Sequence, residues 1–385
     1  MNTGRRVWCE RLLDRRSFVR QSACTLALFS LPTPLFPFFP QNMRQGLVKP
    51  HPALFYQVRP NQKVKCQLCP RQCEVKPGER GDCGVRENRK GSYYSLVYGN
   101  PCAVHVDPIE KKPLFHVLPG TPSYSIATAG CNLHCIFCQN WEISQAKPEE
   151  TYNFDTPPDQ VVAGARKNNC PSIAYTYVEP VIFYEYMLDT ARLAKKDGIL
   201  NVCHSAGYVS PEPLAKLAEV LDAACIDLKA FDNKFYQEMV DGELEPVLAT
   251  LKTLSSRGVH VEIVNLVIPQ KNDKPDQIRA MCQWIKKELG PLTPLHFSRF
   301  FPLHKMKNHY PTPVSTLEEA RRIALDSGLK YVYLGNLPGN PAENTHCHNC
   351  GKLVISRRGY AVGEVNLKGD KCRHCGTKIP GIWRS

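Results

Sequence analysis

Three cysteines lie within eight consecutive residues, in a pattern that can bind an inorganic cluster. Cys131, Cys135 and Cys138 are spaced C-x3-C-x2-C, one ligand short of the four that structural zinc requires. Three thiolates can instead hold three corners of a four-iron cluster and leave one iron open to a small molecule. The alternative is zinc with His134 as fourth ligand, but this loop is shorter than such zinc sites use. The spacing therefore favours an iron–sulfur cluster with an open iron.

Four cysteines nearer the N-terminus have the ligand count of a closed metal site. Pro77 and Gly78 provide a turn between them. The pattern allows zinc or an auxiliary iron–sulfur cluster, and a zinc knuckle is favoured on ligand count. The four ligands are Cys66, Cys69, Cys73 and Cys83.

Two C-x2-C pairs near the other end of the chain are spaced as in a zinc ribbon, on either side of a strand-like segment, 352–360. Their cysteines are Cys347, Cys350, Cys372 and Cys375. Neither cysteine-rich module is long enough to form a core of its own, so we expect both to fold around their metal.

The composition is otherwise that of a globular protein, with 43% hydrophobic and 22% charged residues among 385. A chain of this length can bury its own core, so its 18 cysteines, which fall in tight groups, indicate metal sites rather than disulfides. The net charge of +13 comes from basic residues that are scattered along the chain. Without a recognisable surface of aromatic and basic residues, this charge does not favour nucleic-acid binding.

The first fifty residues form a separate segment. Arg15 and Arg16, followed by Phe18 and an apolar run over 23–31, resemble a twin-arginine export signal. The alternative is a disordered basic extension. The apolar run is shorter than the ~20 residues of a membrane span, so we expect no transmembrane helix here. Residues 1–50 are therefore left out of the fold.

Short apolar segments alternate with amphipathic ones over residues 123–340. The apolar segments, typical of strands buried on both faces, are 123–128, 172–177, 200–205, 223–229, 260–268, 295–300 and 330–335. The expected helices are 157–168, 181–197, 211–221, 232–240, 245–257, 274–288 and 315–328. This alternation predicts an α/β fold with a parallel sheet, as a partial or complete (β/α) barrel. Chemistry in such barrels follows the carboxyl ends of strands, and the three-cysteine loop directly follows 123–128.

These features resemble those of radical S-adenosylmethionine (SAM) enzymes. The signature is C-x3-C-x2-C with an aromatic residue, Phe137, before the last cysteine. More closely, the sequence is similar to the radical enzymes of the AmmeMemoRadiSam system, which are relatives of the pyruvate formate-lyase activating enzyme. The similar segments, within a resemblance that covers 53–352, are "CNLHCIFCQNWEISQ", "DPIEKKPLFHVLPG", "IAYTYVEP", "ACIDLKAF" and "YVYLGNLPGN".

The resemblance implies a function and its cofactors. Cys131, Cys135 and Cys138 would bind a 4Fe–4S cluster whose open iron takes the amino and carboxylate groups of SAM. An electron from a low-potential donor would cleave SAM to a 5′-deoxyadenosyl radical, which abstracts hydrogen from an unidentified protein or small-molecule substrate. The resemblance also suggests Memo- and AMMECR-domain proteins as partners.

The resemblance further implies which residues contact SAM. Glu179 would meet the methionine ammonium, although Tyr177 and Val178 stand where the superfamily has two glycines. The alternative for Glu179 is a cap on the helix that follows it. Ser205 would lie on the ribose side, in a loop with Ala206 in place of an asparagine.

Three more residues are carried over from the family. Asp227 and Lys229 match an Asp-x-Lys that lies against the cofactor in activating enzymes. Phe137 would pack near the adenine, with a role as a core aromatic residue as the alternative. The alternative function for this protein is that of a non-catalytic iron–sulfur electron carrier or a zinc-binding adaptor. This alternative predicts four protein ligands for each metal group and no pocket for a cofactor.

The predicted domains are a signal-like tail (1–50), a Cys-rich module (51–122), a radical SAM barrel (123–340) and a zinc-ribbon-like module (341–385). The arginine pair points to export or membrane association, whereas SAM and low-potential electrons are cytoplasmic supplies. The sequence therefore leaves the localisation open.

Overall fold

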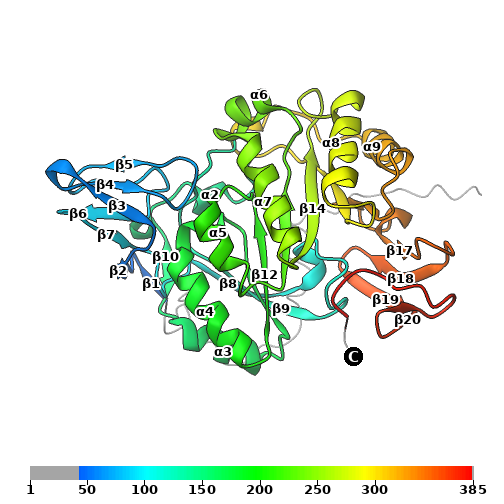
Figure 1. The fold of residues 1–385 in the computed structure, drawn as a ribbon, viewed down its shortest axis with the longest axis horizontal. Helices are drawn as coiled ribbons and strands as arrows, with labels where there is room; N and C mark the ends of the chain where they lie inside the picture. Colours follow the sequence, from blue (N-terminus) through cyan, green and yellow to red (C-terminus); the bar gives the residue numbers. More distant parts are fainter. Residues whose placement is uncertain (1–42, 384–385) are drawn as a thin grey trace, which may run out of the picture. The chain divides into compact units, whose positions relative to one another are not determined.

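The computed structural model describes residues 43–383, so the signal-like motif at Arg15 and Arg16 lies outside the described residues. The described residues all belong to one compact unit. Its centre is an eight-stranded sheet (Figure 1). In spatial order the strands are β16 (Val332–Gly335), β15 (Leu295–Arg299), β14 (His260–Val267), β13 (Ala223–Asp227), β12 (Leu200–Ser205), β11 (Ser172–Tyr175), β9 (Pro122–Ala127) and β8 (Ala103–Pro108).

The strands from β9 to β16 pair in parallel, in the order in which they occur along the chain. The apolar residues along each of these strands follow one another without alternation, because a parallel sheet covered by helices buries both of its faces. Strand β8 pairs antiparallel with β9 and is an edge of this sheet. Among the described residues β8 and β16 do not pair with each other, so the sheet is a partial barrel, one of the two predicted forms.

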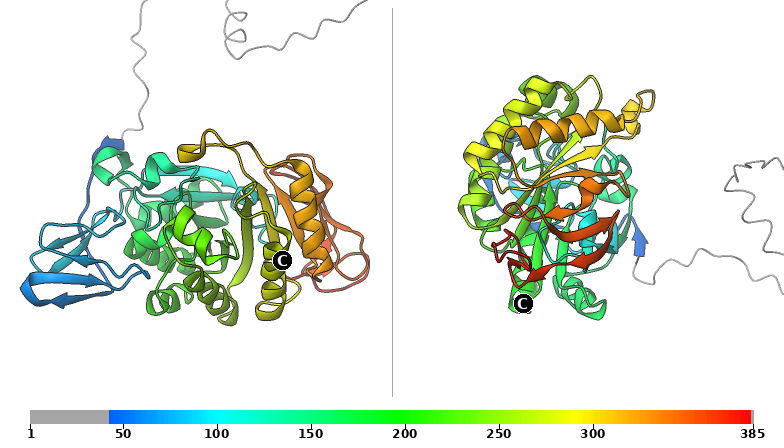
Figure 2. Two further views of the ribbon diagram at one scale, coloured as in Figure 1. Left: turned by 90° about the horizontal axis from the view of Figure 1, so that it is seen from above. Right: turned by 90° about the vertical axis from the view of Figure 1, so that its right-hand side faces the viewer.

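Helices connect successive parallel strands and pack on them (Figures 1 and 2). Each follows a strand and returns the chain to the start of the next, as βαβ units require. The longer helices are α3 (Pro158–Lys167), α4 (Tyr184–Lys196), α5 (Pro211–Leu217), α7 (Leu244–Ser256), α8 (Pro275–Glu288) and α9 (Val314–Asp326). The segment predicted as one helix over 232–240 is instead a short α6 (Asn233–Phe235) that continues as a π-helix, η5 (Tyr236–Val240).

The N-terminal cysteines lie among small antiparallel sheets, drawn in blue in Figure 1. One sheet contains β3 (Tyr56–Arg59), β4 (Lys63–Cys66) and β5 (Glu74–Val75), and another contains β2 (His51–Pro52), β7 (Ser92–Ser95) and β6 (Arg86–Arg89). Strand β1 (Met43–Gln45) pairs with β10 (Tyr152–Phe154), which follows the three-cysteine loop in sequence. The first described strand is thereby tied to the region that follows the three-cysteine loop.

The C-terminal module packs on the end of the central sheet. It contains β17 (Thr345–His346), β18 (Leu353–Arg358), β19 (Ala361–Val365), β20 (Leu367–Lys368) and β21 (Lys371–Cys372). Its buried Val354 and Ile355 belong to the same apolar cluster as Phe115 and Tyr333. The module therefore shares a core with the barrel. Over residues 43–383, no helix is long and apolar enough to cross a membrane.

Candidate active site at the carboxyl ends of the strands

One cavity of about 530 Å³ opens at the carboxyl ends of the parallel strands. It collects the residues that the sequence predicts to hold an iron–sulfur cluster and SAM, from the loops or ends of four successive strands: β9, β11, β12 and β13. The predicted residues that line it are Cys131, Cys135, Cys138, Phe137, Glu179, Ser205, Asp227 and Lys229.

The three-cysteine loop is held by backbone hydrogen bonds to the π-helix η5. His134 N–H donates to the carbonyl of Val240 at 3.0 Å, and Ile136 N–H donates to Met239 at 3.0 Å. Both acceptors lie at the end of the π-helix η5, and such π-turns occur often at functional sites. The irregular helix therefore positions the cysteines by presenting carbonyl groups to their loop.

Gly130, immediately before Cys131, has a conformation that other residues adopt rarely, with φ +93°. A Cβ atom here would lie 2.6 Å from the Cys83 carbonyl oxygen and 2.5 Å from Val85 Cγ1. The glycine therefore lets the N-terminal cysteine module come into direct contact with the start of the three-cysteine loop.

The sulfurs of this loop are arranged differently from those of a single-ion site. Among residues 43–383, the only group of three or more His, Cys, Asp or Glu residues whose ligand atoms all lie within 4.8 Å of one another is the C-terminal group of four cysteines. Ligands to different irons of one cluster are separated by the cluster itself, so the three-cysteine loop is not expected to meet that criterion. Burial raises the pKa of Cys135 to about 11, and the nearby Lys229 ammonium opposes this rise.

Glu179 is both a helix cap and a wall of the cavity. Its Oε1 accepts from Val181 N–H, at the start of η4 (Pro180–Phe183), and from the Ser205 hydroxyl at 2.6 Å. Its Oε2 accepts from Ala206 N–H at 2.7 Å. Burial raises the pKa of Glu179, and these donors oppose the rise. The two predicted roles of Glu179 are therefore compatible, and Ser205 orients its carboxylate.

Asp227 joins two basic side chains at the end of β13. It lies 2.7 Å from His204 Nε2 and 3.0 Å from Lys229 Nζ. Burial alone would raise the pKa of Asp227, but Lys229 and His204 outweigh it and hold the pKa well below its usual range. Lys229 Nζ also lies 5.9 Å from the Phe137 ring centroid, and Phe137 packs on Phe235. Phe137 is thus a core residue that also faces the cavity.

Tyr177, which by the resemblance replaces a glycine of the wider superfamily, has a φ of +68°, in the left-handed region. Its hydroxyl donates to Asp107, and Lys112 Nζ lies 4.3 Å from its ring centroid. Lys112 Nζ also bonds to Asp107 at 2.5 Å. These contacts hold a side chain in a backbone conformation that costs free energy without glycine.

The sequence analysis did not single out several other residues of the cavity. Some of them come from the quoted segment 107–120, and others come from the C-terminal module, which closes one side of the cavity. The quoted motif was a usable signal for the first set, whereas only the tertiary structure brings in the second. From segment 107–120 these residues are Glu110, Lys111 and Lys112, and from the C-terminal module they are Glu343 and Tyr360. Asn140 and Asn336 lie in two other quoted segments, and His204 lies near the end of β12.

The C-terminal cysteines have the geometry of a single-ion site. The Sγ atoms of Cys347 and Cys375 are 3.6 Å apart, and those of Cys350 and Cys372 are 3.9 Å apart. Tetrahedral zinc with Zn–S bonds of about 2.3 Å would place its sulfurs about 3.8 Å apart. The four side chains therefore fit zinc without rearrangement.

The N-terminal cysteines lie together beside the three-cysteine loop. Burial raises the pKa of Cys69 to about 12, with a further rise from Cys66 and a lowering by the Asn132 side chain. Burial also raises the pKa of Cys83 to about 12, and Cys66 and Cys69 both interact with it electrostatically. Asn132 directly follows Cys131, so the two predicted metal groups are neighbours in space.

Comparison with known proteins agrees with this geometry. Residues 125–285 match the model of the radical SAM superfamily. The chain is 46% identical to the uncharacterized protein MJ0808 of Methanocaldococcus jannaschii, over 85% of this chain and 98% of that protein. It is 23% identical to the pyruvate formate-lyase-activating enzyme of Clostridium pasteurianum, over 52% of this chain and 87% of that enzyme.

Among solved structures, a domain of the pyruvate-formate lyase-activating enzyme from Bacteroides vulgatus aligns with 42% of this chain and 98% of its own length. Its sequence identity is 17% and its TM-score 0.38. The superfamily match spans the three-cysteine loop and the strands whose ends carry Glu179, Ser205 and Asp227. Residues 125–285 are therefore a radical SAM domain, and this family implies a 4Fe–4S cluster and SAM as cofactors.

Proposed function

We propose that this protein is an activating-enzyme-like radical SAM enzyme that abstracts hydrogen from a protein or small-molecule substrate. The observation that carries this proposal is the single cavity that joins three cysteines to Glu179 and Lys229. The similarity to the C. pasteurianum activating enzyme supports the reaction type. The motifs quoted above support membership of the AmmeMemoRadiSam system, and hence Memo- and AMMECR-domain proteins as candidate partners.

The donor set of the cavity fits the implied cofactors. When bound, a 4Fe–4S cluster and SAM together supply a one-electron cleavage that yields a 5′-deoxyadenosyl radical. Cys131, Cys135 and Cys138 would provide three cluster ligands and leave one iron without a protein ligand. Glu179 would accept a hydrogen bond from the methionine ammonium, since a carboxylate with three donors already in place can still accept another.

Other residues of the cavity orient and shield the reacting groups. Asp227 holds the Lys229 ammonium in place, so that a fixed positive charge faces the cluster end of the cavity. Leu133, Phe137 and Leu266 form apolar walls that exclude water from a reactive intermediate. The protein would thus orient the cofactors, supply a fixed charge and exclude water from the cavity, while the cofactors would carry out the bond cleavage.

The C-terminal cysteines support a further part of the proposal, which is structural zinc. Their sulfur separations of 3.6 and 3.9 Å match a tetrahedral ion. The module contributes Glu343 and Tyr360 to the cavity, so its metal would fix one wall of the active site.

Anaerobic reconstitution followed by a SAM-cleavage assay tests the proposed function. The reduced protein should release 5′-deoxyadenosine and methionine, and the Cys131→Ala/Cys135→Ala/Cys138→Ala variant should release neither. A reduced wild-type protein that has a full cluster but binds no SAM would contradict the proposal. That result would favour the alternative, a non-catalytic electron carrier or zinc-binding adaptor.

A further inference from the structure

We propose that Cys66, Cys69, Cys73 and Cys83 bind a second iron–sulfur cluster, which passes electrons to the cluster at Cys131, Cys135 and Cys138. The electron-transfer part rests on the proposed function, whereas the metal assignment does not. Sequence alone favoured zinc at the N-terminal group. Three observations in the structure favour iron and sulfide instead.

The first observation is the separation of the sulfurs. In the part of the chain that the structure describes, no three of the four N-terminal sulfurs lie within 4.8 Å of one another, whereas the C-terminal four do. The segments that carry these cysteines are nevertheless neighbours, because Cys66 N–H donates to the Cys73 carbonyl at 2.9 Å and Cys73 Sγ accepts from the N–H of Asp82, next to Cys83, at 3.5 Å. In this respect the group resembles the three-cysteine loop and differs from the zinc-type ribbon. A metal–sulfide core fits such a group better than a single ion does.

The second observation is a pair of buried donors without a partner. Tyr93 is 2% exposed, and its hydroxyl has no hydrogen-bond partner among the described residues. A Cβ atom at Gly81 would lie 2.8 Å from this hydroxyl and 3.8 Å from Cys73 Sγ, so hydroxyl and thiol flank the same glycine. Arg86 Nε is also buried and unpartnered. An iron–sulfur cluster offers several sulfur acceptors for such donors, and they tune its reduction potential.

The third observation is direct contact with the three-cysteine loop. Arg71 Nε, two residues after Cys69, donates to the Asn132 carbonyl at 2.5 Å. Asp82, next to Cys83, lies 2.9 Å from Arg71 Nε and 2.9 Å from His134 Nε2. Because His134 lies between two of the catalytic cysteines, one carboxylate links both cysteine groups.

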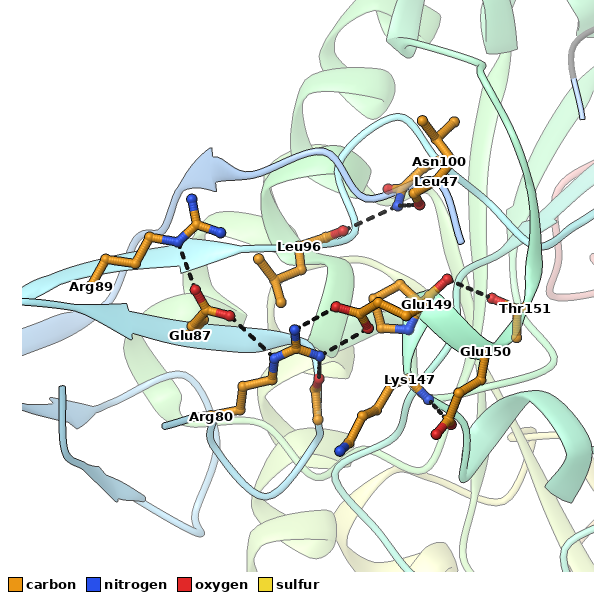
Figure 3. A network of polar contacts seen from close by, with 12 residues as sticks. Leu47, Arg80, Glu87, Arg89, Leu96, Asn100, Lys147, Glu149, Glu150 and Thr151 are labelled. Atoms are coloured by element: carbon orange, nitrogen blue, oxygen red, sulfur yellow. Dashed lines mark hydrogen bonds and ion pairs between the residues drawn. The ribbon is translucent and has the colours of Figure 1, made fainter. Parts of the chain in front are cut away.

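A further ion pair fixes the same orientation. Arg80, three residues before Cys83, binds Glu149 through both guanidinium ends, at 2.5 and 3.0 Å, and also reaches Glu87 (Figure 3). Glu149 lies in η3 (Pro148–Glu150), shortly after the three-cysteine loop. Two separate sets of polar contacts therefore hold the N-terminal cysteine segment beside the three-cysteine loop and the residues that follow it, so the two cysteine groups are close in space.

The proposed transfer conserves electrons. A low-potential one-electron donor reduces the N-terminal cluster, and this cluster returns to its oxidised state when it gives the same electron to the catalytic cluster. The N-terminal cluster undergoes no net change, so the only electron consumed is the one that SAM cleavage requires.

Metal analysis of the Cys131→Ala/Cys135→Ala/Cys138→Ala variant tests the metal assignment. After anaerobic reconstitution with iron and sulfide, the variant should keep about four irons and four sulfides per chain, held by the N-terminal cysteines, and about one zinc. No iron in the variant, with about two zincs per chain, would overturn the proposal. If the variant does not fold, the metal content of the reconstituted wild type is the test. About eight irons and one zinc per chain support the proposal, and about four irons and two zincs per chain contradict it.

Electron paramagnetic resonance tests the electronic contact without an activity assay. In the fully reduced wild type, two neighbouring paramagnetic clusters should broaden each other's signals, and the triple variant should show one narrow, isolated signal. If the signal of the cluster at the N-terminal cysteines has the same shape in the wild type and in the triple variant, the proposed electron transfer between the two clusters is wrong. Wild-type protein with two clusters but no SAM cleavage would instead contradict only the proposed function.

A conservative substitution tests the buried hydroxyl. Tyr93→Phe should keep the iron content and lower the reduction potential of the N-terminal cluster, because it removes a donor to sulfur. Tyr94→Phe, on the other face of β7, is the matched control and should leave the potential unchanged. Equal potentials in Tyr93→Phe and wild type would show that the hydroxyl does not face a cluster.

Discussion

Single residues of this active site combine a structural contact with a place in the cavity. Glu179 shows this most clearly, because the same carboxylate caps η4 and accepts from Ser205 and Ala206 at the cavity wall. Tyr177 combines a left-handed backbone with a hydroxyl bound to Asp107. Substitution at such positions is therefore expected to change both stability and ligand binding, and only a measurement of each can separate them.

Glu179→Gln should weaken SAM binding by one to three orders of magnitude. Loss of one side of a charge-assisted, partly desolvated hydrogen bond typically costs about 2–5 kcal/mol. Titration of SAM into reconstituted protein, with melting curves, provides the measurement. Ser205→Ala is a comparison variant at another residue of the cavity: it removes one donor to Glu179, leaves the charge of Glu179 in place and should cost about 1 kcal/mol of stability. Unchanged affinity in Glu179→Gln, with a lowered melting temperature, would leave Glu179 only its role as a cap.

Asp107→Asn should reduce the decrease in the free energy of unfolding that occurs as the pH is lowered. Burial raises the pKa of Asp107, but Lys112, Tyr177 and Lys111 outweigh it and hold the pKa well below its usual value. The folded chain thus binds fewer protons than the unfolded chain below about pH 4, so this stabilisation is present above that pH and is lost as the pH falls. Urea unfolding from pH 7 to pH 2.5 should show an acid-dependent loss smaller by about 1–3 kcal/mol in the variant. Parallel curves for the two proteins would contradict the shift.

At the scale of elements, segments outside the regular strands and helices position the three-cysteine loop and one wall of the cavity. The π-helix η5 gives its last carbonyls to the three-cysteine loop, and the C-terminal module covers one side of the cavity with Glu343 and Tyr360. The module shares an apolar cluster with Phe115 and Tyr333, so its cysteine group and the candidate active site are structurally linked.

Cys375→Ser should therefore remove about one zinc per chain and also lower the melting temperature of the whole unit. The four-thiolate site loses a ligand, and the strands that it holds lie against the barrel core. Zinc analysis with differential scanning calorimetry provides the measurement, and Cys102→Ser, outside every cysteine group, is the control. Air exposure should remove iron from the wild type but not zinc, since zinc has no redox chemistry. Unchanged zinc in Cys375→Ser would refute the ribbon assignment.

For the molecule as a whole, a buried ion pair joins the N-terminal module to the barrel. Arg86 on β6 and Glu185 on α4 are 1% and 3% exposed and meet at 2.8 and 2.9 Å, and Glu185 also accepts from Leu54 N–H. Both charges would be costly to bury alone. The pair therefore makes the attachment of the module specific.

Arg86→Met should destabilise the protein by about 3–5 kcal/mol, because it leaves the Glu185 carboxylate buried without its partner. Arg89→Met, at an exposed position on the same strand, should change the stability by less than about 1 kcal/mol. The double variant Arg86→Met/Glu185→Gln should recover part of the loss. Urea unfolding measures all three, and similar midpoints for the two single variants would show that the pair does not join the units.

The sequence by itself determined the alternation of strands and helices and the place of the three-cysteine loop. Strands buried on both faces, such as β13 and β14, are continuous apolar runs that can be recognised locally, and Cys131, Cys135 and Cys138 lie within one loop. For the same reason, each of the seven parallel strands begins and ends within two residues of its predicted segment.

Only the tertiary structure decided the features that depend on partners far apart in the chain. The antiparallel edge strand β8, the contact of Asp107 with Tyr177, the pair of Arg86 with Glu185 and the link from Asp82 to His134 leave no periodic pattern in the sequence. From its sequence, the segment 236–240 is predicted to be part of an ordinary α-helix. In the structure it is a π-helix whose last carbonyls accept hydrogen bonds from the cysteine loop, and the local sequence does not contain that contact. Local patterns are set by neighbours in sequence, whereas buried polar contacts are set by which distant groups the folded chain brings together.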